Sequence, residues 1–191
     1  PEVVALELDK GRYMGLKEKK ESKLSIRSVK DIGLKGYVFA LIAKYVSNKV
    51  GNATGFVPGS EMLEASKIAK ENNIKISLID QDIKKTLKNF SDRITWREKF
   101  RFVYDIVKGL FIREKIPFDV RKVPSSEIVR SLILKVKDRY PSVYISLIED
   151  RNKVMAKKLF KLTRLYKVVA VVGAGHEEEI VEEFKKLERA N

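Results

Sequence analysis

Three short apolar runs, far apart in the chain, constrain the fold more than any other feature of the sequence. Each is rich in β-branched residues and is followed by polar residues or glycine and then by a helical pattern: Val3–Leu8, Ile74–Ile79 and Val168–Val172. The first and third are almost entirely apolar, as expected for strands covered on both faces of a sheet. Long segments separate the runs, so parallel crossover connections are available. The sequence therefore predicts an α/β fold with a mostly parallel sheet and flanking helices.

The segments between the runs carry helical patterns. We expect Ser60 to be an N-cap, a loop over residues 117–124, and helices over residues 31–50, 60–72, 81–90, 95–112, 125–139, 142–166 and 177–188. Residues 90–166 form a helical insertion between the second and third strands of a single domain over residues 1–191. Because Pro1 is followed at once by an apolar run, we expect the domain to be incomplete at its N-terminus and the chain to be a fragment of a longer protein.

The absence of cysteine and the single histidine among 191 residues limit the chemistry of the chain. Without cysteine there is no disulfide scaffold, no Cys-ligated zinc or iron–sulfur site and no thiol catalysis. One histidine also excludes, within this chain, any site that needs two imidazoles.

The net charge of +14 permits nucleic acid or an anionic membrane as a partner without establishing either. The excess is concentrated in residues 96–167, which hold 19 Lys and Arg against 8 Asp and Glu. These bases alternate with apolar residues at helical spacing, and Lys outnumbers Arg 28 to 12 in the chain, which favours solvated helix faces. We expect no specific nucleic-acid partner. Because no run of 18 apolar residues occurs, we also expect no membrane span in this chain.

Polar side chains follow all three expected strands. Glu7 and Asp9 follow the first, Asp80 and Asp82 the second, and residues 173–176 the third. In open α/β sheets, ligands bind beyond the carboxyl ends of the strands, so these groups mark a candidate site. Acidic residues at such turns also serve as helix caps, and both interpretations stay open for each of them.

The Gly-Ala-Gly-His turn after the third strand has several interpretations. Gly173 and Gly175 resemble the start of a dinucleotide fingerprint, but Glu178 occupies the third glycine position and Glu177–Glu179 would repel a phosphate. Alternatively, the glycines present His176 to a metal or a substrate. The simplest interpretation is a tight turn with an incidental polar residue.

A charged residue interrupts the apolar stripe of the expected helix over residues 142–166. Arg151 falls between Ile148 and Met155, where a buried guanidinium is costly unless it is paired or reaches outward to solvent. Reaching to solvent is the commoner outcome. The functional alternative is that Arg151 pairs with an acidic group at the site, such as Glu7 or Asp80.

Several stretches of the sequence together resemble one protein family, the TraB/PrgY pheromone-shutdown family in its archaeal and bacterial form. The motifs that carry the resemblance are ELDxxR, PGxEM, IDxDI, EDRN and GAGH. They lie in VVALELDKGRY (3–13), VPGSEMLEASKIAKENNIKISLIDQDI (57–83), YPSVYISLIEDRNKVMA (140–156) and VVAVVGAGH (168–176).

The resemblance implies an α/β fold related to Tiki metalloproteases and erythromycin-esterase-like proteins, with two GxxH motifs and a Glu and an Arg between them. The second GxxH runs from Gly173 to His176. The first is missing from this sequence; in the family it lies just upstream, so one βα unit of about 30 residues would be absent. We therefore expect this fragment to be inactive. The resemblance assigns His176 and Glu7 as metal ligands. It assigns Glu61, Arg12 and Arg151 as catalytic residues. Further motif positions are Asp80, Asp82, Glu149 and Gly173.

The activity implied for the intact protein is hydrolysis of a peptide bond by a metal-activated water, with a peptide or protein as substrate. Glu61 or Glu7 would act as base and an Arg would steady the oxyanion, although Glu61 in isolation is a first-turn residue that favours the helix dipole. A carboxylate-rich ligand set with one or two histidines suits Mn²⁺ or another divalent transition metal.

Two further functions stay open. One is a peptide-binding or regulatory domain without catalysis, which acts by sequestering a peptide signal. The other is a basic module that binds nucleic acid or a membrane surface. The resemblance also allows membrane association through segments outside this chain.

Overall fold

A computed structural model describes residues 1–18, 30, 32–33, 36–38, 40–41, 59–111 and 126–190 of the chain. Its sheet has three strands, β1 (Val3–Leu6), β2 (Lys75–Leu78) and β3 (Val168–Val171), in the order β2-β1-β3. Both pairings are parallel. The expected strands and their parallel arrangement are confirmed, although each strand is one or two residues shorter than its apolar run.

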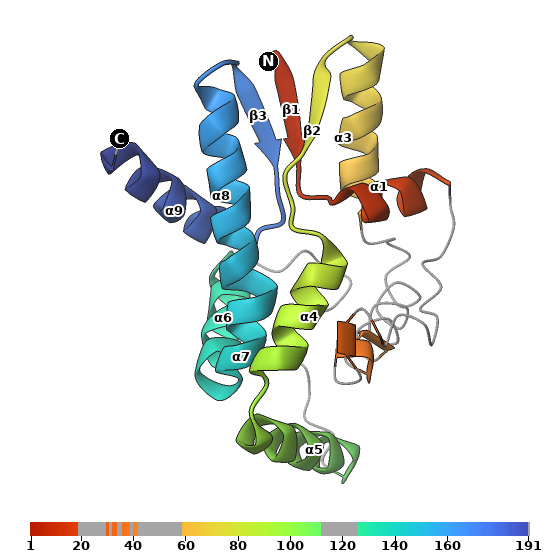
Figure 1. Ribbon diagram of the computed structural model, residues 1–191, viewed down its shortest axis with the longest axis vertical. Coiled ribbons are helices and arrows are strands. Elements are labelled where there is room, and N and C mark those ends of the chain that lie inside the picture. Colours follow the sequence, from red (N-terminus) through yellow and green to blue (C-terminus); the bar gives the residue numbers. More distant parts are fainter. Residues whose placement is uncertain are drawn as a thin grey trace.

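The described helices lie on both sides of this sheet and beyond the carboxyl ends of its strands (Figure 1). They are α1 (Lys10–Lys17), α3 (Ser60–Glu71), α4 (Ile83–Arg93), α5 (Trp96–Phe111), α6 (Ser126–Arg139), α7 (Pro141–Tyr144), the π-helix Ile145–Glu149, α8 (Asp150–Thr163) and α9 (Glu177–Arg189). The helix expected over residues 142–166 is thus α7, the π-helix and α8 in sequence. Most of the helix expected over residues 31–50, and the loop over 117–124, lie outside the described residues.

The two faces of the sheet are covered by different helices because side chains alternate along each strand. On one face, Val4, Leu6 and Leu8 pack with residues of α1 and α3. On the other, Ala5 packs with residues of α8 and α9, among them Met155. All four residues of β1 are buried, since the strand is paired on both sides and covered on both faces.

The start of α3 differs from the expected one. Its N-cap is Gly59 and not Ser60, and Gly59 adopts a left-handed conformation with φ of +92°. A Cβ at this position would also lie 2.9 Å from the Leu16 side chain. The left-handed backbone therefore favours glycine here, and a larger residue would also displace the end of the Leu16 side chain. The sequence pattern around Ser60 does not show this.

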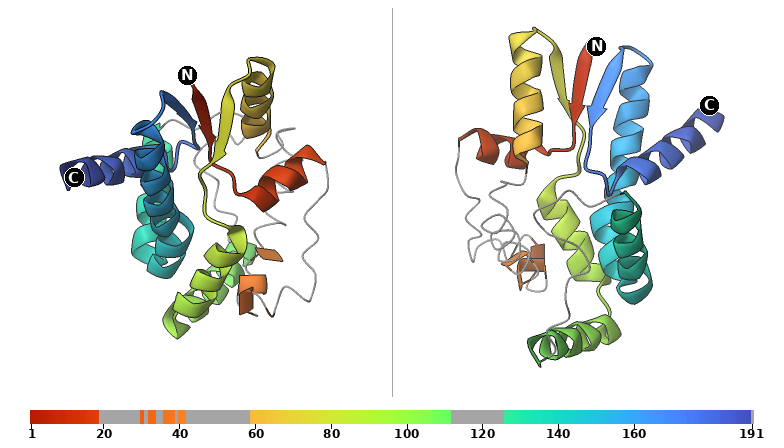
Figure 2. Two further views of the ribbon diagram at one scale, coloured as in Figure 1. Left: turned by 45° about the horizontal axis from the view of Figure 1, so that its top comes forward. Right: turned by 180° about the vertical axis from the view of Figure 1, so that it is seen from behind.

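Helices α4 to α8 connect β2 to β3, and α4, α5 and α6 lie beyond the carboxyl ends of the strands (Figure 1). Helix α5 is at the end of the molecule farthest from the start of β1, as the view from behind also shows (Figure 2). Among the described residues, none of the helices has the length and apolar character needed to cross a membrane.

Candidate functional site

Three strand ends and α8 bring four ionisable side chains together. Glu7 follows β1, Asp80 follows β2, His176 follows β3, and Arg151 extends from α8 between them. We call these four residues the edge cluster. Parallel strands end at the same edge of a sheet, so residues far apart in sequence meet there.

Arg151 is the centre of the edge cluster. Its Nε and Nη2 donate to the two oxygens of Asp80 at 2.9 and 2.7 Å, and Nη2 also donates to Glu7 Oε1 at 2.6 Å. The side chains of Arg151, Glu7 and Asp80 are only 15%, 10% and 2% exposed. Burial would lower the pKa of Arg151, but the bonds and charges of the two carboxylates raise it above its ordinary value. The pairing of Arg151 with Glu7 and Asp80 is confirmed, and the alternative that it reaches to solvent is wrong.

The π-helix Ile145–Glu149 helps to place Arg151. A π turn inserts one extra residue, so it rotates the helix that follows by about 100° relative to an uninterrupted α-helix. Arg151 is the second residue of α8, directly after this turn. Its Nη1 donates to the carbonyl of Leu147 inside the π-helix at 3.1 Å. The irregular turn therefore both directs the guanidinium toward the strand ends and supplies it with an acceptor.

His176 is neutral at pH 7 in this setting. Burial lowers its pKa, the charge of Arg151 lowers it further, and Glu7 opposes them without reversing the shift. The ring Nδ1 lies 2.6 Å from Oδ1 of Asn152, whose Nδ2 donates to Glu179 Oε2 at 2.7 Å. This network assigns the proton of the neutral ring to Nδ1. The lone pair on Nε2 then faces Glu7 Oε1 at 3.3 Å and Arg151 Nη1 at 3.2 Å.

A second set of contacts holds the positions of the edge cluster. The N–H of Gly173 donates to Glu7 Oε2 at 2.7 Å, and a Cβ on Gly173 would lie 3.3 Å from that oxygen. Asp80 also accepts from Arg12 Nη1 at 3.2 Å, and the Arg12 side chain is 40% exposed. Asp9 caps α1 through Oδ1, which accepts from the N–H groups of Gly11 and Arg12. Arg12 thus joins the cluster from its solvent side.

Three of the expected site residues make other contacts. Glu61 accepts a hydrogen bond from the N–H of Gly59 at 3.1 Å, at the start of α3. Asp82 caps α4 by accepting from the N–H of Lys84 at 2.7 Å. Glu149 pairs with Lys153 one turn along the helix. For Asp82 and Glu61 the contacts match the structural interpretation, a helix cap and a first-turn residue. The functional roles of all three residues stay predictions.

Two residues of the site were missed as site residues. Asn152 is 1% exposed and orients His176. Its place next to Arg151 in the EDRN motif could have identified it, because a polar amide on the buried side of a helix needs a hydrogen-bond partner. Glu179 is the second; it accepts from Asn152 and, at 2.5 Å, from the hydroxyl of Tyr144. Glu179 is one of three consecutive glutamates at the start of α9, so the sequence does not distinguish it from its neighbours.

The edge cluster by itself does not fit a catalytic metal. His176 Nε2 and Glu7 Oε1 are 3.3 Å apart, about the spacing of two atoms bound to one ion by bonds near 2.1 Å. However, the guanidinium of Arg151 lies against both atoms. Within the described part of the chain, no group of three or more His, Cys, Asp or Glu is arranged to hold a metal ion. A catalytic zinc typically takes three protein ligands.

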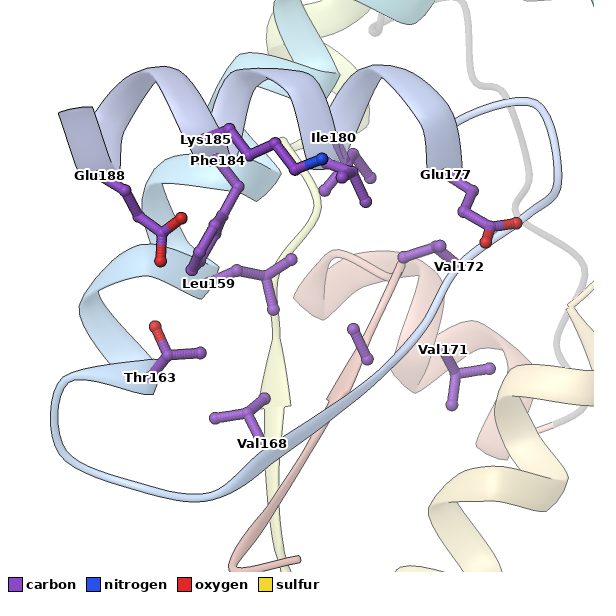
Figure 3. Close-up of a pocket in the computed structure, with 12 residues that line it drawn as sticks. Leu159, Thr163, Val168, Val171, Val172, Glu177, Ile180, Phe184, Lys185 and Glu188 are labelled. Carbon is purple, nitrogen blue, oxygen red and sulfur yellow. The ribbon is translucent and has the colours of Figure 1, made fainter.

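An apolar cavity of about 750 Å³ lies on the same side of the sheet as α8 and α9 (Figure 3). Its wall consists of Val168 and Val172 from β3 and its extension, Leu159 from α8, and Ile180 and Phe184 from α9. Glu177, the residue after His176, lies at its rim. The cavity therefore lies along β3, and one of its lining residues is the sequence neighbour of His176.

Comparison with known proteins agrees with the family resemblance of the sequence motifs. The profile of the TraB/PrgY/gumN family matches residues 1–188. A protein of Methanocaldococcus jannaschii described as uncharacterized is 36% identical over 198 residues, a region that covers 100% of this chain and 48% of the relative. The chain thus spans about half the length of the curated relative it matches. No solved structure matches. The chain belongs to the TraB/PrgY/gumN family.

Proposed function

We propose that this member of the TraB/PrgY/gumN family acts on peptides, and that the edge cluster is the site of hydrolysis in the intact protein. One observation carries the proposal: a neutral His176, oriented by Asn152, directs the lone pair of Nε2 toward a Glu7 carboxylate 3.3 Å away. Pairs of this kind bind metal ions and transfer protons. Burying such a pair costs free energy unless other groups compensate it, as Arg151 and the N–H of Gly173 do for Glu7.

The surrounding charges suit hydrolysis of a peptide bond. Arg12 is partly exposed, so it is the cation best placed to meet an oxyanion or a peptide carboxylate. Arg151 is the positioning residue, since its bonds hold the carboxylates of Glu7 and Asp80. Glu61 is exposed at the start of α3, which begins at the same edge of the sheet, and we assign it as a candidate base.

The cavity along β3 supports a peptide as the substrate. Its wall is largely apolar, and it opens next to the residue that follows His176. We infer that an extended chain would place an apolar side chain in this cavity (Figure 3) and a peptide group toward the edge cluster.

A divalent metal remains part of the proposal for the intact protein. His176 and Glu7 supply two ligand atoms at a suitable spacing, and Mn²⁺ or a similar ion suits such nitrogen and oxygen donors. At least one further ligand has to come from outside the described residues, and Arg151 has to withdraw from Nε2.

Peptide binding without cleavage is the second candidate. The contacts of Arg151 with His176 Nε2 and with Glu7 favour binding without cleavage. The guanidinium already lies against the two atoms that hydrolysis would require. The cavity along β3 is sufficient for binding alone.

The test is to incubate the intact protein, not this chain alone, with a mixture of apolar peptides, with and without Mn²⁺, and to follow cleavage by mass spectrometry and bound metal by elemental analysis. We expect Glu7→Gln and His176→Ala to abolish cleavage. Glu64→Gln, which changes an exposed glutamate on α3, is the matched control and should have no effect. Cleavage that persists in both variants, or the absence of both cleavage and peptide binding, would contradict the proposal. Binding without cleavage that survives His176→Ala favours the second candidate.

A further inference from the structure

Helix α5 exposes three large aromatic side chains in a row. Trp96, Phe100 and Tyr104 are 71%, 72% and 64% exposed. They are spaced four residues apart, so they lie on one side of the helix, and the rings of Trp96 and Phe100 are 6.2 Å apart. We call these three residues the aromatic stripe. Single exposed apolar residues are common on protein surfaces, but a contiguous patch of this kind indicates an interaction site.

The aromatic stripe is not the face by which α5 packs on the domain. That contact is made by other residues: Phe102 meets the ring of Tyr140 edge to face at 6.0 Å, and Asp105 pairs with Arg139. Glu98 is 4% exposed and accepts from the N–H and the hydroxyl of Ser142, both at 2.7 Å. The helix is therefore anchored on one side, and the stripe is left on the other.

The charges around the aromatic stripe are basic. Helix α5 carries Arg97, Lys99, Arg101 and Lys108, and the ammonium of Lys99 lies 3.6 Å from the ring centre of Trp96. The acidic residues of the helix, Glu98 and Asp105, bond within the domain. Arg101 also donates to the carbonyl of Arg139 at 2.7 Å, and that bond leaves its positive charge in place. The surface that α5 presents is thus apolar and aromatic at its centre and positive at its margins.

We propose that α5 is an interfacial helix that inserts the aromatic stripe into the headgroup region of an anionic lipid bilayer. Amphipathic helices that lie in this region carry Trp or Phe on the buried side and Lys or Arg at the margins, and Trp and Tyr rings favour the headgroup level of a membrane. Lysine and arginine near the surface are attracted to anionic lipids.

The position of α5 favours a bilayer over a protein groove. The helix lies at the end of the molecule, beyond the other elements (Figures 1 and 2). A flat lipid surface accepts an exposed helix without a matching cavity. The basic excess of residues 96–167 adds attraction that is not specific to one partner. This inference is independent of the edge cluster and does not require hydrolysis.

Trp96 is the only tryptophan of the chain, so its fluorescence reports directly on the aromatic stripe. The experiment adds vesicles of phosphatidylglycerol and phosphatidylcholine, or of phosphatidylcholine alone, to the full chain. We expect a blue shift with the anionic vesicles, a decrease of that shift as salt is raised, and quenching by brominated lipid. Neutral vesicles should leave the emission unchanged.

The double variant Phe100→Ser and Tyr104→Ser should lower partitioning into anionic vesicles at least about tenfold, because it removes two apolar contacts. Leu165→Ser is the matched control: it changes another exposed apolar residue, 73% exposed and outside α5, and should partition like the parent. Far-UV circular dichroism of all proteins checks that the fold is retained.

Three results would overturn the proposal: no shift with anionic vesicles, equal binding to neutral ones, or full binding by a folded double variant. Self-association that shifts the emission of Trp96 in the absence of lipid would also overturn it, since a second copy would then cover the aromatic stripe.

Discussion

Arg151 neutralises carboxylates that follow two different strands, so its replacement would leave Glu7 without an arginine partner and Asp80 with Arg12 alone. We predict that Arg151→Met lowers the free energy of unfolding by about 3–5 kcal/mol, as for other buried pairs broken on one side. Urea denaturation followed by circular dichroism measures this. Arg130→Met is the control, because Arg130 forms an exposed pair with Glu178 and should cost at most about 1 kcal/mol. Equal losses in the two variants would show that the edge cluster is not a buried network.

The single histidine makes the pH dependence of the site directly measurable. Because the pKa of His176 is lowered in the folded protein, the unfolded chain binds the proton more readily between that value and about 6.5. The contribution of His176 to stability is therefore complete above about pH 6.5 and is lost as the pH falls below it. Proton NMR of the imidazole should give a pKa below 6.5. A pKa at or above 6.5 would contradict the burial and the tautomer described for this ring.

The residues of the edge cluster could be predicted from the sequence, but their contacts could not. Glu7 lies near the end of the first apolar run, and Asp80 and His176 follow the other two, which alone places the three residues at one edge. Whether Arg151 reaches them or solvent depends on the direction of α8. A π turn of five residues sets that direction, and nothing in the apolar spacing of residues 140–166 distinguishes such a turn from an α-helix.

At the scale of elements, Glu98 joins two helices through one carboxylate. Thr95 and Glu98 form a capping box at the start of α5, with Thr95 N–H to Glu98 Oε2 at 3.0 Å and Glu98 N–H to Thr95 Oγ1 at 3.2 Å. The other oxygen of Glu98 accepts from the N–H of Ser142 in α7 at 2.7 Å. One side chain thus satisfies the first turns of α5 and α7.

We predict that Glu98→Gln costs about 1–3 kcal/mol of stability, because the amide loses a charge-assisted acceptor at both helix ends. Burial would raise the pKa of Glu98, but the hydrogen bonds from Ser142 and Thr95 outweigh it and lower that pKa. The contribution is therefore present above about pH 4.5 and is lost as the pH falls through the folded-state pKa. Urea denaturation at pH 7 and at pH 3 tests this: the difference between parent and variant should shrink at pH 3. Glu64→Gln should cost less than about 0.5 kcal/mol at either pH.

The elements themselves were largely predictable, since their apolar periods are strong. The helices over residues 125–139 and 177–188 begin and end within a residue or two of α6 and α9. The start of α3 was not predictable, because the cap at Gly59 depends on its left-handed backbone and on its contact with Leu16 from another helix. Local sequence contains no information on that contact.

At the scale of the whole molecule, stability should be greatest along the central strand. The residues of β1 are buried and bonded on both sides, whereas β2 and β3 each have one strand neighbour in the described sheet. We predict that amides of Val4, Ala5 and Leu6 are among the slowest to exchange with deuterium and that those of α5 exchange much faster. Hydrogen exchange with mass spectrometry checks the order, and slower exchange in α5 than in β1 would refute it.

The same central strand has a consequence for synthesis. Val3 pairs with Lys75 on one side and with Val168 on the other, so β1 leaves the ribosome long before either neighbour exists. During that interval neither of its partners in the described sheet is present, and exposed apolar side chains of this kind favour aggregation. Premature termination before residue 168 would leave β1 without its pairing to β3. The order of the strands in the sheet thus makes the yield of folded protein depend on how quickly translation reaches β3.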